Sequence, residues 1–328
     1  MERPTVAVTY SPADEERQVY RELLSDLADL VFLPDLDAEA RSQALRGSHV
    51  LMSGSIRREV SADDAQLLRN AHLIQILSAG ADAVPFERIP PGIEIASNVG
   101  AFSEPIAEHV MAMVLALAKR IVIEDIHLRE GVFDHKVKSR TVAGMTAGIV
   151  GFGGIGKATA RLMRGFDMRI LAVNRTGETD EPVEFAGSMS DLDRVLSGSD
   201  VVVLSLPLTA DTRGLIDKRR LELMKRNAIL VNVARGALID EEALYRHAKN
   251  DPEFLVGLDV WWDEPFRDGA FHSKNPILAL PNVIGSPHNS GNVPGIGAVA
   301  ARHAAANVRR FLTGEPLRGV VRREEYLH

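Results

Sequence analysis

The chain of 328 residues is 45% hydrophobic and 25% charged, with 38 basic and 45 acidic residues and a formal net charge of -7. At about 150 residues per domain this length predicts roughly two globular domains, and the composition excludes a fully disordered or fibrous protein. The acidic balance argues against a nucleic-acid partner, which requires a basic face. The absence of cysteine excludes disulfides, Cys-ligated zinc, iron–sulfur clusters and thiolate nucleophiles.

The N-terminus shows no secretory leader pattern, because residues 1–5 lead directly into a strand-like run. The longest apolar stretch covers residues 110–118, which is short of the roughly 20 residues that a transmembrane helix needs. We therefore expect a soluble, cytoplasmic protein with no membrane partner, whose redox chemistry, if any, depends on an organic cofactor.

Short apolar runs alternate with amphipathic segments in the first third of the chain, and this rhythm predicts a parallel sheet covered by helices. The expected strands are 5–10, 30–33, 49–53, 73–78 and 93–97, and the expected helices include 14–30, 38–46 and 61–70.

A long helix is expected over residues 103–120, and it is apolar almost all the way round, so it should be buried in a core or between subunits. A second series of strands follows, with the nearly continuous hydrophobic runs of strands buried on both faces. Its expected strands are 147–150, 169–174, 200–206, 228–232, 255–260 and 283–286, and a last helix covers 296–312. The expected fold class is α/β, with two similar open, doubly wound parallel sheets.

The segment 151–156 reads Gly-Phe-Gly-Gly-Ile-Gly and fits the dinucleotide-binding pattern G-x-G-x-x-G in its required context, between a strand and a helix. Gly151 permits the tight turn, Gly153 lets the backbone approach a pyrophosphate, and Gly156 allows the helix to pack on the strand. Gly154 and Ile155 would present N–H groups at the helix start to the anion.

The acidic residue expected about 20 positions further on is absent, because the next strand ends in Asn174-Arg175-Thr176. For NAD(H) this loses the acceptor for the ribose hydroxyls; for NADP(H) it removes a repulsion. That repulsion would be about 4 kcal/mol for a carboxylate ~4 Å from a phosphate at a dielectric of ~20. Arg175 could pair with the 2′-phosphate, so NADP(H) is the preferred cofactor. If Arg175 is instead a solvated loop residue, NAD(H) could serve as well.

Three further segments place polar side chains just past expected strands: Arg235, Glu264 and His288. Ligands of open parallel sheets bind at the carboxyl ends of the strands, so these side chains should share one rim with the glycine loop. The remaining histidines show no metal-ligand spacing, and no metal is expected.

At this point the sequence resembles the D-isomer-specific 2-hydroxyacid dehydrogenase family over most of its length. The resemblance is carried by Ser78-Ala79-Gly80-Ala81-Asp82, Ala107-Glu108-His109, Gly151–Gly156, Leu206-Pro207-Leu208-Thr209, Asn232–Gly236, Asp259-Val260 with Glu264-Pro265, and Pro287-His288. It implies a discontinuous substrate-binding domain, residues 1–98 and 290–328, a dinucleotide-binding domain, residues 99–289, and a cleft between them. It also suggests a homodimer, together with the apolar helix over 103–120.

By this resemblance, Arg235 holds the carboxylate and keto oxygen of a small 2-keto or 2-hydroxy acid, His288 is the acid/base, and Glu264 orients it. This agrees with the chemistry, since histidine titrates near neutrality and a neighbouring carboxylate favours the imidazolium. Backbone N–H groups of Ala79, Gly80 and Ala81 could bind the same carboxylate.

Other roles carried over from the family concern the cofactor. Asp259 would accept a hydrogen bond from the nicotinamide carboxamide, or is simply a solvated acid at a strand end. Pro207 and Thr212 would lie along the adenosine, or form only a turn. Ala234 completes the cofactor-binding set. Glu108 and His109 are expected to contribute to helix packing or to the junction between the two domains rather than to catalysis. Trp261-Trp262 departs from the family's usual smaller residues and would wall the substrate pocket or a subunit contact, or only pack.

The favoured function is an NADP(H)-preferring 2-keto acid reductase, such as a glyoxylate or hydroxypyruvate reductase. A D-3-phosphoglycerate dehydrogenase is the closest enzymatic alternative. Formate dehydrogenases share the architecture but have glutamine where Glu264 stands. A dinucleotide-sensing transcriptional corepressor is an alternative of a different class.

Overall fold

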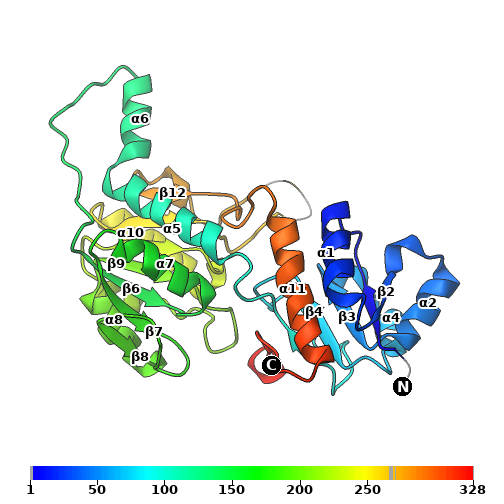
Figure 1. Ribbon diagram of the computed structural model, residues 1–328. Helices are drawn as coiled ribbons and strands as arrows, with labels where there is room; N and C mark the ends of the chain where they lie inside the picture. The colour runs from blue at the N-terminus through cyan, green and yellow to red at the C-terminus, as the bar shows by residue number, and fades with distance from the viewer. Residues whose placement is uncertain (1–2, 266–268, 270, 328) are drawn as a thin grey trace. The chain divides into compact units, whose positions relative to one another are not determined.

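The computed structural model describes residues 3–265, 269 and 271–327. The chain divides into two compact units (Figure 1). Unit 1 consists of Met1–Phe102 with Val293–His328, so the last helix of the chain belongs with the N-terminal segment. Unit 2 is the continuous segment Ser103–Asn292.

Unit 1 contains a five-stranded sheet in which all the strand pairs are parallel. The strand order is β2-β1-β3-β4-β5, an order in which the direction of winding reverses between β1 and β3. The strands are β1 (Thr5–Val8), β2 (Asp29–Phe32), β3 (Val50–Ser53), β4 (Leu73–Ile76) and β5 (Glu94–Ala96).

Helices cover both faces of this sheet, because alternate residues of each strand point to opposite sides. Val6 and Val8 of β1 pack in a cluster with α1 (Asp14–Leu24) and α11 (Ile296–Leu312). Ala7 lies in a second cluster on the other face. The helices on that face are α2 (Ala38–Gly47), α3 (Ile56–Glu59) and α4 (Ala62–Leu67).

Unit 2 contains a seven-stranded parallel sheet in the order β12-β11-β10-β9-β6-β7-β8. The winding reverses between β6 and β9, which is the position where dinucleotides bind in folds of this type. The strands are β6 (Thr146–Val150), β7 (Arg169–Val173), β8 (Phe185–Gly187), β9 (Val201–Leu204), β10 (Ile229–Asn232), β11 (Leu255–Leu258) and β12 (Val283–Gly285).

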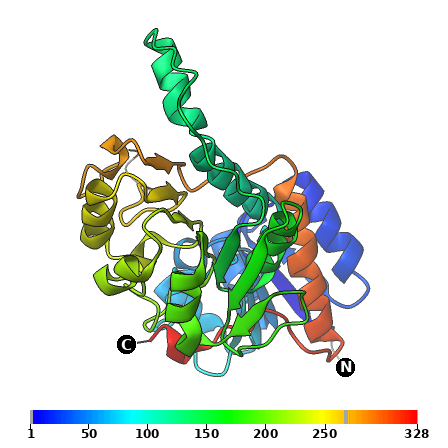
Figure 2. The same ribbon diagram turned by 90° about the vertical axis from the view of Figure 1, so that its left-hand side faces the viewer.

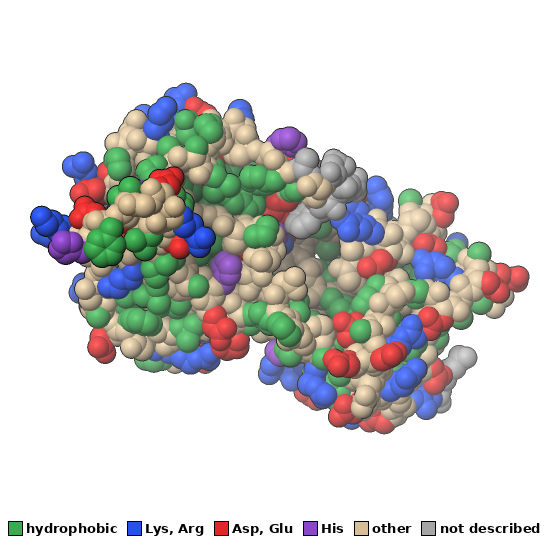
Figure 3. All heavy atoms as spheres, turned by 90° about the horizontal axis from the view of Figure 1, so that it is seen from above, with side chains coloured by type: hydrophobic (Ala, Val, Ile, Leu, Met, Phe, Trp, Pro, Cys, Tyr) green, Lys and Arg blue, Asp and Glu red, His purple; other side chains and the backbone are tan. Residues whose placement is uncertain are grey.

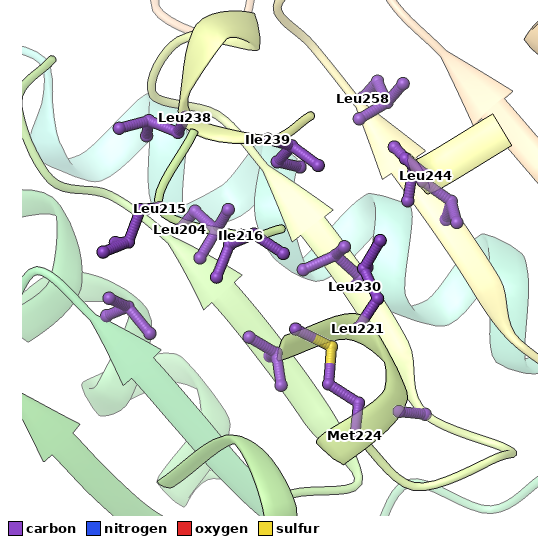
Figure 4. Close-up of a cluster of buried hydrophobic side chains, with 14 of the residues drawn as sticks. Leu204, Leu215, Ile216, Leu221, Met224, Leu230, Leu238, Ile239, Leu244 and Leu258 are labelled. Atoms are coloured by element: carbon purple, nitrogen blue, oxygen red, sulfur yellow. The ribbon is translucent and has the colours of Figure 1, made fainter. Parts of the chain in front are cut away.

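One face of the second sheet carries a core of leucine and isoleucine side chains, packed between the strands and the helices (Figure 4). Leu204, Leu230 and Leu258 reach this core from successive strands. The helices of this face are α8 (Leu192–Gly198), α9 (Lys218–Leu223) and α10 (Glu241–Asn250), and the others of unit 2 are α5 (Ser103–Ala118), α6 (Ile121–Arg129) and α7 (Gly154–Arg164).

The α/β fold class with two parallel sheets is confirmed, although several predicted boundaries are wrong. The helix predicted over 14–30 ends at Leu24, because the following apolar residues pair with β1 as strand β2. Strand β8 and helix α6 were not predicted. Within the described part of the chain, no helix is long and apolar enough to cross a membrane.

The predicted apolar helix forms α5, and most of its apolar side chains are buried. It packs against α7 and the strands β10 and β11, all within unit 2. The continuation as α6 extends away from the sheet and buries none of its residues (Figure 2). The exposed apolar surface in this region therefore belongs to α6, not to α5.

Candidate active site

The glycine loop joins β6 to α7 at the position where the winding of the second sheet reverses. Gly151 has a φ of 95°, and a Cβ on it would lie 2.6 Å from the backbone nitrogen of Leu206. A Cβ on Gly156 would lie 2.3 Å from the carbonyl oxygen of Gly151. A Cβ on Gly153, by contrast, would have nothing within 4 Å. The loop is thus tightly closed on the protein side and open at Gly153.

This geometry fits the pyrophosphate of a dinucleotide. Gly153 is the N-cap of α7, and Gly154 and Ile155 begin its first turn. The first N–H groups of a helix lack intrahelical acceptors and carry a partial positive charge, so they favour an anion. Gly153 leaves room for that anion to approach the backbone.

The loop after β7 is organised by the side chain of Asn174. Its amide oxygen accepts hydrogen bonds from the N–H groups of Thr176 and Gly177 at 3.0 and 2.7 Å, and its amide nitrogen donates to the carbonyl oxygen of Glu178 at 2.7 Å. Arg175, at the tip of this turn, is exposed. The asparagine therefore builds the loop that presents Arg175.

The predicted adenosine-side residues form a compact turn after β9. The Thr212 hydroxyl donates to the carbonyl oxygen of Pro207 at 2.8 Å and accepts from the N–H of Thr209 at 2.8 Å. Ser205 joins this turn to the glycine loop, because its hydroxyl donates to the carbonyl oxygen of Gly151 at 2.7 Å. The turn chemistry of Pro207 and Thr212 is therefore present; their contact with a cofactor remains a prediction.

Arg235 follows β10 in a loop fixed by Asn232, whose side chain donates to the Arg235 carbonyl at 2.8 Å and accepts from the Ala234 N–H at 3.0 Å. The next residue must be glycine, since a Cβ on Gly236 would lie 2.3 Å from the carbonyl carbon of Trp261. The Arg235 loop is therefore pressed directly against the segment that follows β11.

That segment carries Glu264, which forms the central pair of the site. His288 Nδ1 lies 2.9 Å from both carboxylate oxygens of Glu264. Glu264 Oε1 also accepts the N–H of Trp261 at 3.0 Å. The Glu264 side chain is 14% exposed and that of His288 28%. The carboxylate is thus held inside while the imidazole reaches the surface.

The pairing assigns different roles to the two ring nitrogens of His288. A carboxylate can only accept, so Nδ1 carries a proton, and Nε2 is the atom that can exchange a proton with a ligand. His288 has a positive φ of 51°, a backbone conformation that costs energy in a residue with a Cβ and needs support from its surroundings.

Asp259, at the end of β11, is completely buried. It accepts hydrogen bonds from the Ser286 hydroxyl at 2.6 Å and from the N–H groups of Asn289 and Ser290 at 3.1 and 3.2 Å. Burial opposes its charge, but hydrogen bonds from Ser286, Ser290 and Asn289 outweigh burial and hold the pKa of the carboxyl below its ordinary range. Asp259 is therefore not the solvated acid considered above; its bond to a nicotinamide remains a prediction.

Two residues of this arrangement were not expected to belong to the site: Ser286 had no assigned role, and His109 was assigned to helix packing or the domain junction. Ser286 bonds to Asp259, and His109 Nε2 of α5 lies 2.8 Å from the Ser286 hydroxyl oxygen. The only sequence signals were the polar residue two positions before His288 and the isolated histidine in an otherwise apolar helix.

Trp261 and Trp262 both anchor the active-site loops. The Trp261 indole donates to the carbonyl oxygen of Ser286 at 2.9 Å, and a Cβ on Gly285 would lie 2.6 Å from its ring. The Trp262 indole donates to the carbonyl oxygen of Ile239 at 2.7 Å. Both side chains also line a cavity of about 420 Å³. Their hydrogen bonds favour the packing interpretation.

The predicted substrate-binding turn belongs to unit 1, directly after β4. The Ser78 hydroxyl donates to the carbonyl oxygen of Gly80 at 2.8 Å, Ala79 and Gly80 are half-buried, and Ala81 is buried. Its binding to a substrate carboxylate remains a prediction. No group of three acidic or histidine side chains that could hold a metal ion occurs among the described residues.

Comparison with known proteins agrees with this geometry. Residues 111–290 match the model of the D-isomer specific 2-hydroxyacid dehydrogenase NAD-binding domain. A glyoxylate reductase of Thermococcus gammatolerans is 34% identical over 92% of this chain and 86% of its own, and a hydroxypyruvate reductase of Thermotoga maritima is 35% identical over 70% and 74%.

A solved structure is similar along the whole chain. The D-isomer specific 2-hydroxyacid dehydrogenase of Xanthobacter autotrophicus Py2, in complex with NADPH and MES, has a TM-score of 0.78 and 25% identity, covering 99% of this chain and 100% of that one. The match of more than half of the chain to the domain model, together with these relatives, shows that the protein belongs to the D-isomer specific 2-hydroxyacid dehydrogenase family of NAD(P)-binding oxidoreductases.

Proposed function

We propose that this protein reduces a small 2-keto acid, such as glyoxylate or hydroxypyruvate, to the D-2-hydroxy acid, with NADPH as the preferred cofactor. The observation that carries the proposal is the His288–Glu264 pair, with Nδ1 2.9 Å from both carboxylate oxygens. It lies beyond the carboxyl ends of β11 and β12, in the same sheet whose β6 leads into the glycine loop.

The residues of unit 2 divide the reaction among themselves. Arg235 provides a planar fork of donors for the substrate carboxylate and polarises the keto oxygen. A bound nicotinamide cofactor would supply the hydride that C2 receives. His288 Nε2 delivers a proton to the carbonyl oxygen, while the Glu264 carboxylate accepts the Nδ1 proton in a hydrogen bond and keeps the ring oriented.

The test is to follow NADPH and NADH oxidation with glyoxylate, hydroxypyruvate, 3-phosphohydroxypyruvate and pyruvate, and to determine the configuration of the product. We expect the highest kcat/KM with glyoxylate or hydroxypyruvate and a D-product where the product is chiral. Preference for 3-phosphohydroxypyruvate would assign the phosphoglycerate dehydrogenase activity instead. No turnover with any acid, despite measured cofactor binding, would favour the corepressor function.

The cofactor preference is supported by the loop after β7. No carboxylate occupies positions 174–176, and Asn174 folds the loop that exposes Arg175. The similar Xanthobacter enzyme binds NADPH. Arg175→Ala should raise the KM for NADPH about tenfold, which corresponds to about 1.4 kcal/mol, and leave that for NADH within about twofold. Equal changes in the KM for NADPH and for NADH would mean that Arg175 does not bind the 2′-phosphate.

A homodimer is supported by the surface of α6 and the residues after it. Ile121, Leu128, Val132 and Phe133 are 57%, 58%, 50% and 79% exposed. In Figure 3 hydrophobic side chains are visible on this part of unit 2. Exposed apolar patches of this kind mark protein interfaces, and a second copy of the chain is the partner that we propose. Light scattering of the Leu128→Asp, Phe133→Asp double variant should give a monomer; a monomeric wild type would overturn the dimer.

A further inference from the structure

A chain of polar side chains connects α5 to the loop of His288. His109 Nε2 lies 2.8 Å from Ser286 Oγ, and Ser286 Oγ lies 2.6 Å from Asp259 Oδ1. Asp259 Oδ1 also accepts the N–H of Asn289, and Asp259 Oδ2 accepts that of Ser290. The three side chains come from three different elements: α5, the end of β11 and the end of β12.

The direction of each hydrogen bond among His109, Ser286 and Asp259 follows from the charge of the Asp259 carboxylate. An ionised carboxylate only accepts, so the Ser286 hydroxyl donates its proton to Asp259. The hydroxyl oxygen is then an acceptor toward His109, and His109 Nε2 must carry a proton. The protons therefore run in one sense, from His109 through Ser286 to Asp259, and hydrogen bonds aligned in this way strengthen one another.

The last member of this hydrogen-bonded series, Asp259, bonds to the backbone around His288. Besides the two N–H groups held by the Asp259 carboxylate, the N–H of His288 donates to the Asp259 carbonyl oxygen at 2.7 Å. Three successive N–H groups, of residues 288–290, thus point at one residue. Because His288 has a φ of 51°, these bonds fix an otherwise unfavourable conformation.

We propose that His109 and Ser286 are positioning residues for His288: they orient Asp259, which locks the left-handed turn that carries the acid/base. The inference rests on the proposed function for the role of His288, and it adds two residues that act on His288 through Asp259. It also gives the lone histidine of α5 a task beyond helix packing.

A double-mutant cycle tests this with the full-length protein and the acid that the wild type reduces. We expect Ser286→Ala to lower kcat about tenfold, and His109→Phe, which keeps the ring but removes the donor, about three- to tenfold. The dissociation constant of NADPH, followed by tryptophan fluorescence, should change less than about twofold in both.

The decisive result is the double variant. If His109 acts through Ser286, then His109→Phe should have no further effect on kcat in the Ser286→Ala background, because coupled residues are not additive. Ser286→Thr, which keeps the hydroxyl, should restore kcat to within about threefold. Independent, multiplicative losses would mean that His109 does not act through Ser286 but only packs α5 or acts directly on Asp259, whose Oδ1 lies 3.8 Å from His109 Nε2, and would overturn the proposal.

The matched control is Ser199→Ala. Ser199 is a completely buried serine of unit 2, whereas Ser286 is half-buried; the Ser199 hydroxyl donates to the Val195 carbonyl at 2.6 Å, and Ser199 precedes β9 at the amino end of the strands, away from the His288 loop. It should lose stability and keep kcat. A loss of kcat as large as that of Ser286→Ala would show that the effect is not specific to the network.

Amide hydrogen exchange separates this inference from the proposed function, since it needs no turnover. The amides of residues 288–290 should exchange at least about tenfold faster in His109→Phe and Ser286→Ala than in Ser199→Ala. If the wild type reduces no keto acid, this measurement still decides whether the network holds the loop. Unchanged exchange would overturn the network, and if Ser286→Ala does not fold, His109→Phe alone decides.

Discussion

The carboxyl edges of the two parallel sheets each hold a glutamate in a dense set of hydrogen bonds, yet the two sets differ in kind. In unit 1, Glu59 accepts the hydroxyls of Thr9 and Ser53 at 2.6 and 2.7 Å and the N–H groups of Gly54 and Ser55 at 3.1 and 2.7 Å. It ties the ends of β1 and β3 together, at the point where the winding of this sheet reverses.

In unit 2, Glu264 accepts one backbone N–H and the imidazole of His288. Hydroxyl and backbone N–H groups keep their protons throughout the physiological pH range, whereas an imidazole changes charge within it. The same carboxylate can therefore only hold a loop in unit 1 but can support proton transfer in unit 2. The difference between the structural site at Glu59 and the chemical site at Glu264 therefore lies in the groups that each carboxylate bonds to, not in the carboxylate itself.

The largest effect is expected when His288, the imidazole partner of Glu264, is removed. His288→Ala should lower kcat for keto-acid reduction by about 10²–10⁴, the usual contribution of a positioned general acid. Steady-state kinetics measures this, and NADPH affinity should stay within about threefold, because the glycine loop is untouched. An activity close to that of the wild type would assign proton transfer to another group.

The second-largest effect is expected from a variant that keeps His288 and removes the negative charge of Glu264 beside it. Glu264→Gln should lower kcat about 10- to 100-fold, since the neutral amide replaces one of the two carboxylate oxygens that lie 2.9 Å from Nδ1 and removes the charge beside the ring. Steady-state kinetics measures this, and the dissociation constant of NADPH should stay within about threefold. A kcat within about twofold of the wild type would mean that the reaction does not need the carboxylate of Glu264.

Asp259 offers a comparison within unit 2, as a carboxylate bonded only to hydroxyl and N–H groups. Its pKa is lower in the folded than in the unfolded chain, so its ionised form stabilises the fold above about pH 4, and this contribution is lost as the pH falls through the folded pKa. Asp259→Asn should lower the free energy of unfolding by about 2–4 kcal/mol at pH 7. Urea titrations should show this difference narrowing below about pH 4; a constant difference would exclude the charge as its cause.

The smallest expected effect is that of the structural glutamate. Glu59→Gln should lower the free energy of unfolding by about 1–3 kcal/mol, the penalty of a donor left unpaired, and change kcat less than about threefold. Thermal unfolding and steady-state kinetics measure the two quantities. A loss of kcat comparable to that of Glu264→Gln would mean that Glu59 is not a purely structural residue.

The parts of the molecule that the sequence predicted correctly are those with local patterns. The strand β6, the glycine loop and α7 follow from residues within one short segment, and so does the positive φ of Gly151. Boundaries were predicted less well, as at the end of α1, because the residues around 25–30 suit a helix locally and are drawn into a strand by pairing with β1. The short edge strand β8 (Phe-Ala-Gly) was missed because it contains no β-branched residue, unlike the equally short β5 and β12, which were predicted.

Sequence patterns were enough to predict the fold class, the family resemblance and the chemical identities of Arg235, Glu264 and His288. The resemblance also predicted that Glu264 orients His288, but the hydrogen bonds of Asp259 follow only from how the elements pack: Asp259 bonds to Ser286 rather than to solvent and reaches His109 through it. The reason is physical. Periodicity and turn residues act over a few positions, whereas the hydrogen bond between His109 and Ser286 depends on ångström distances between elements that are 177 residues apart in the chain.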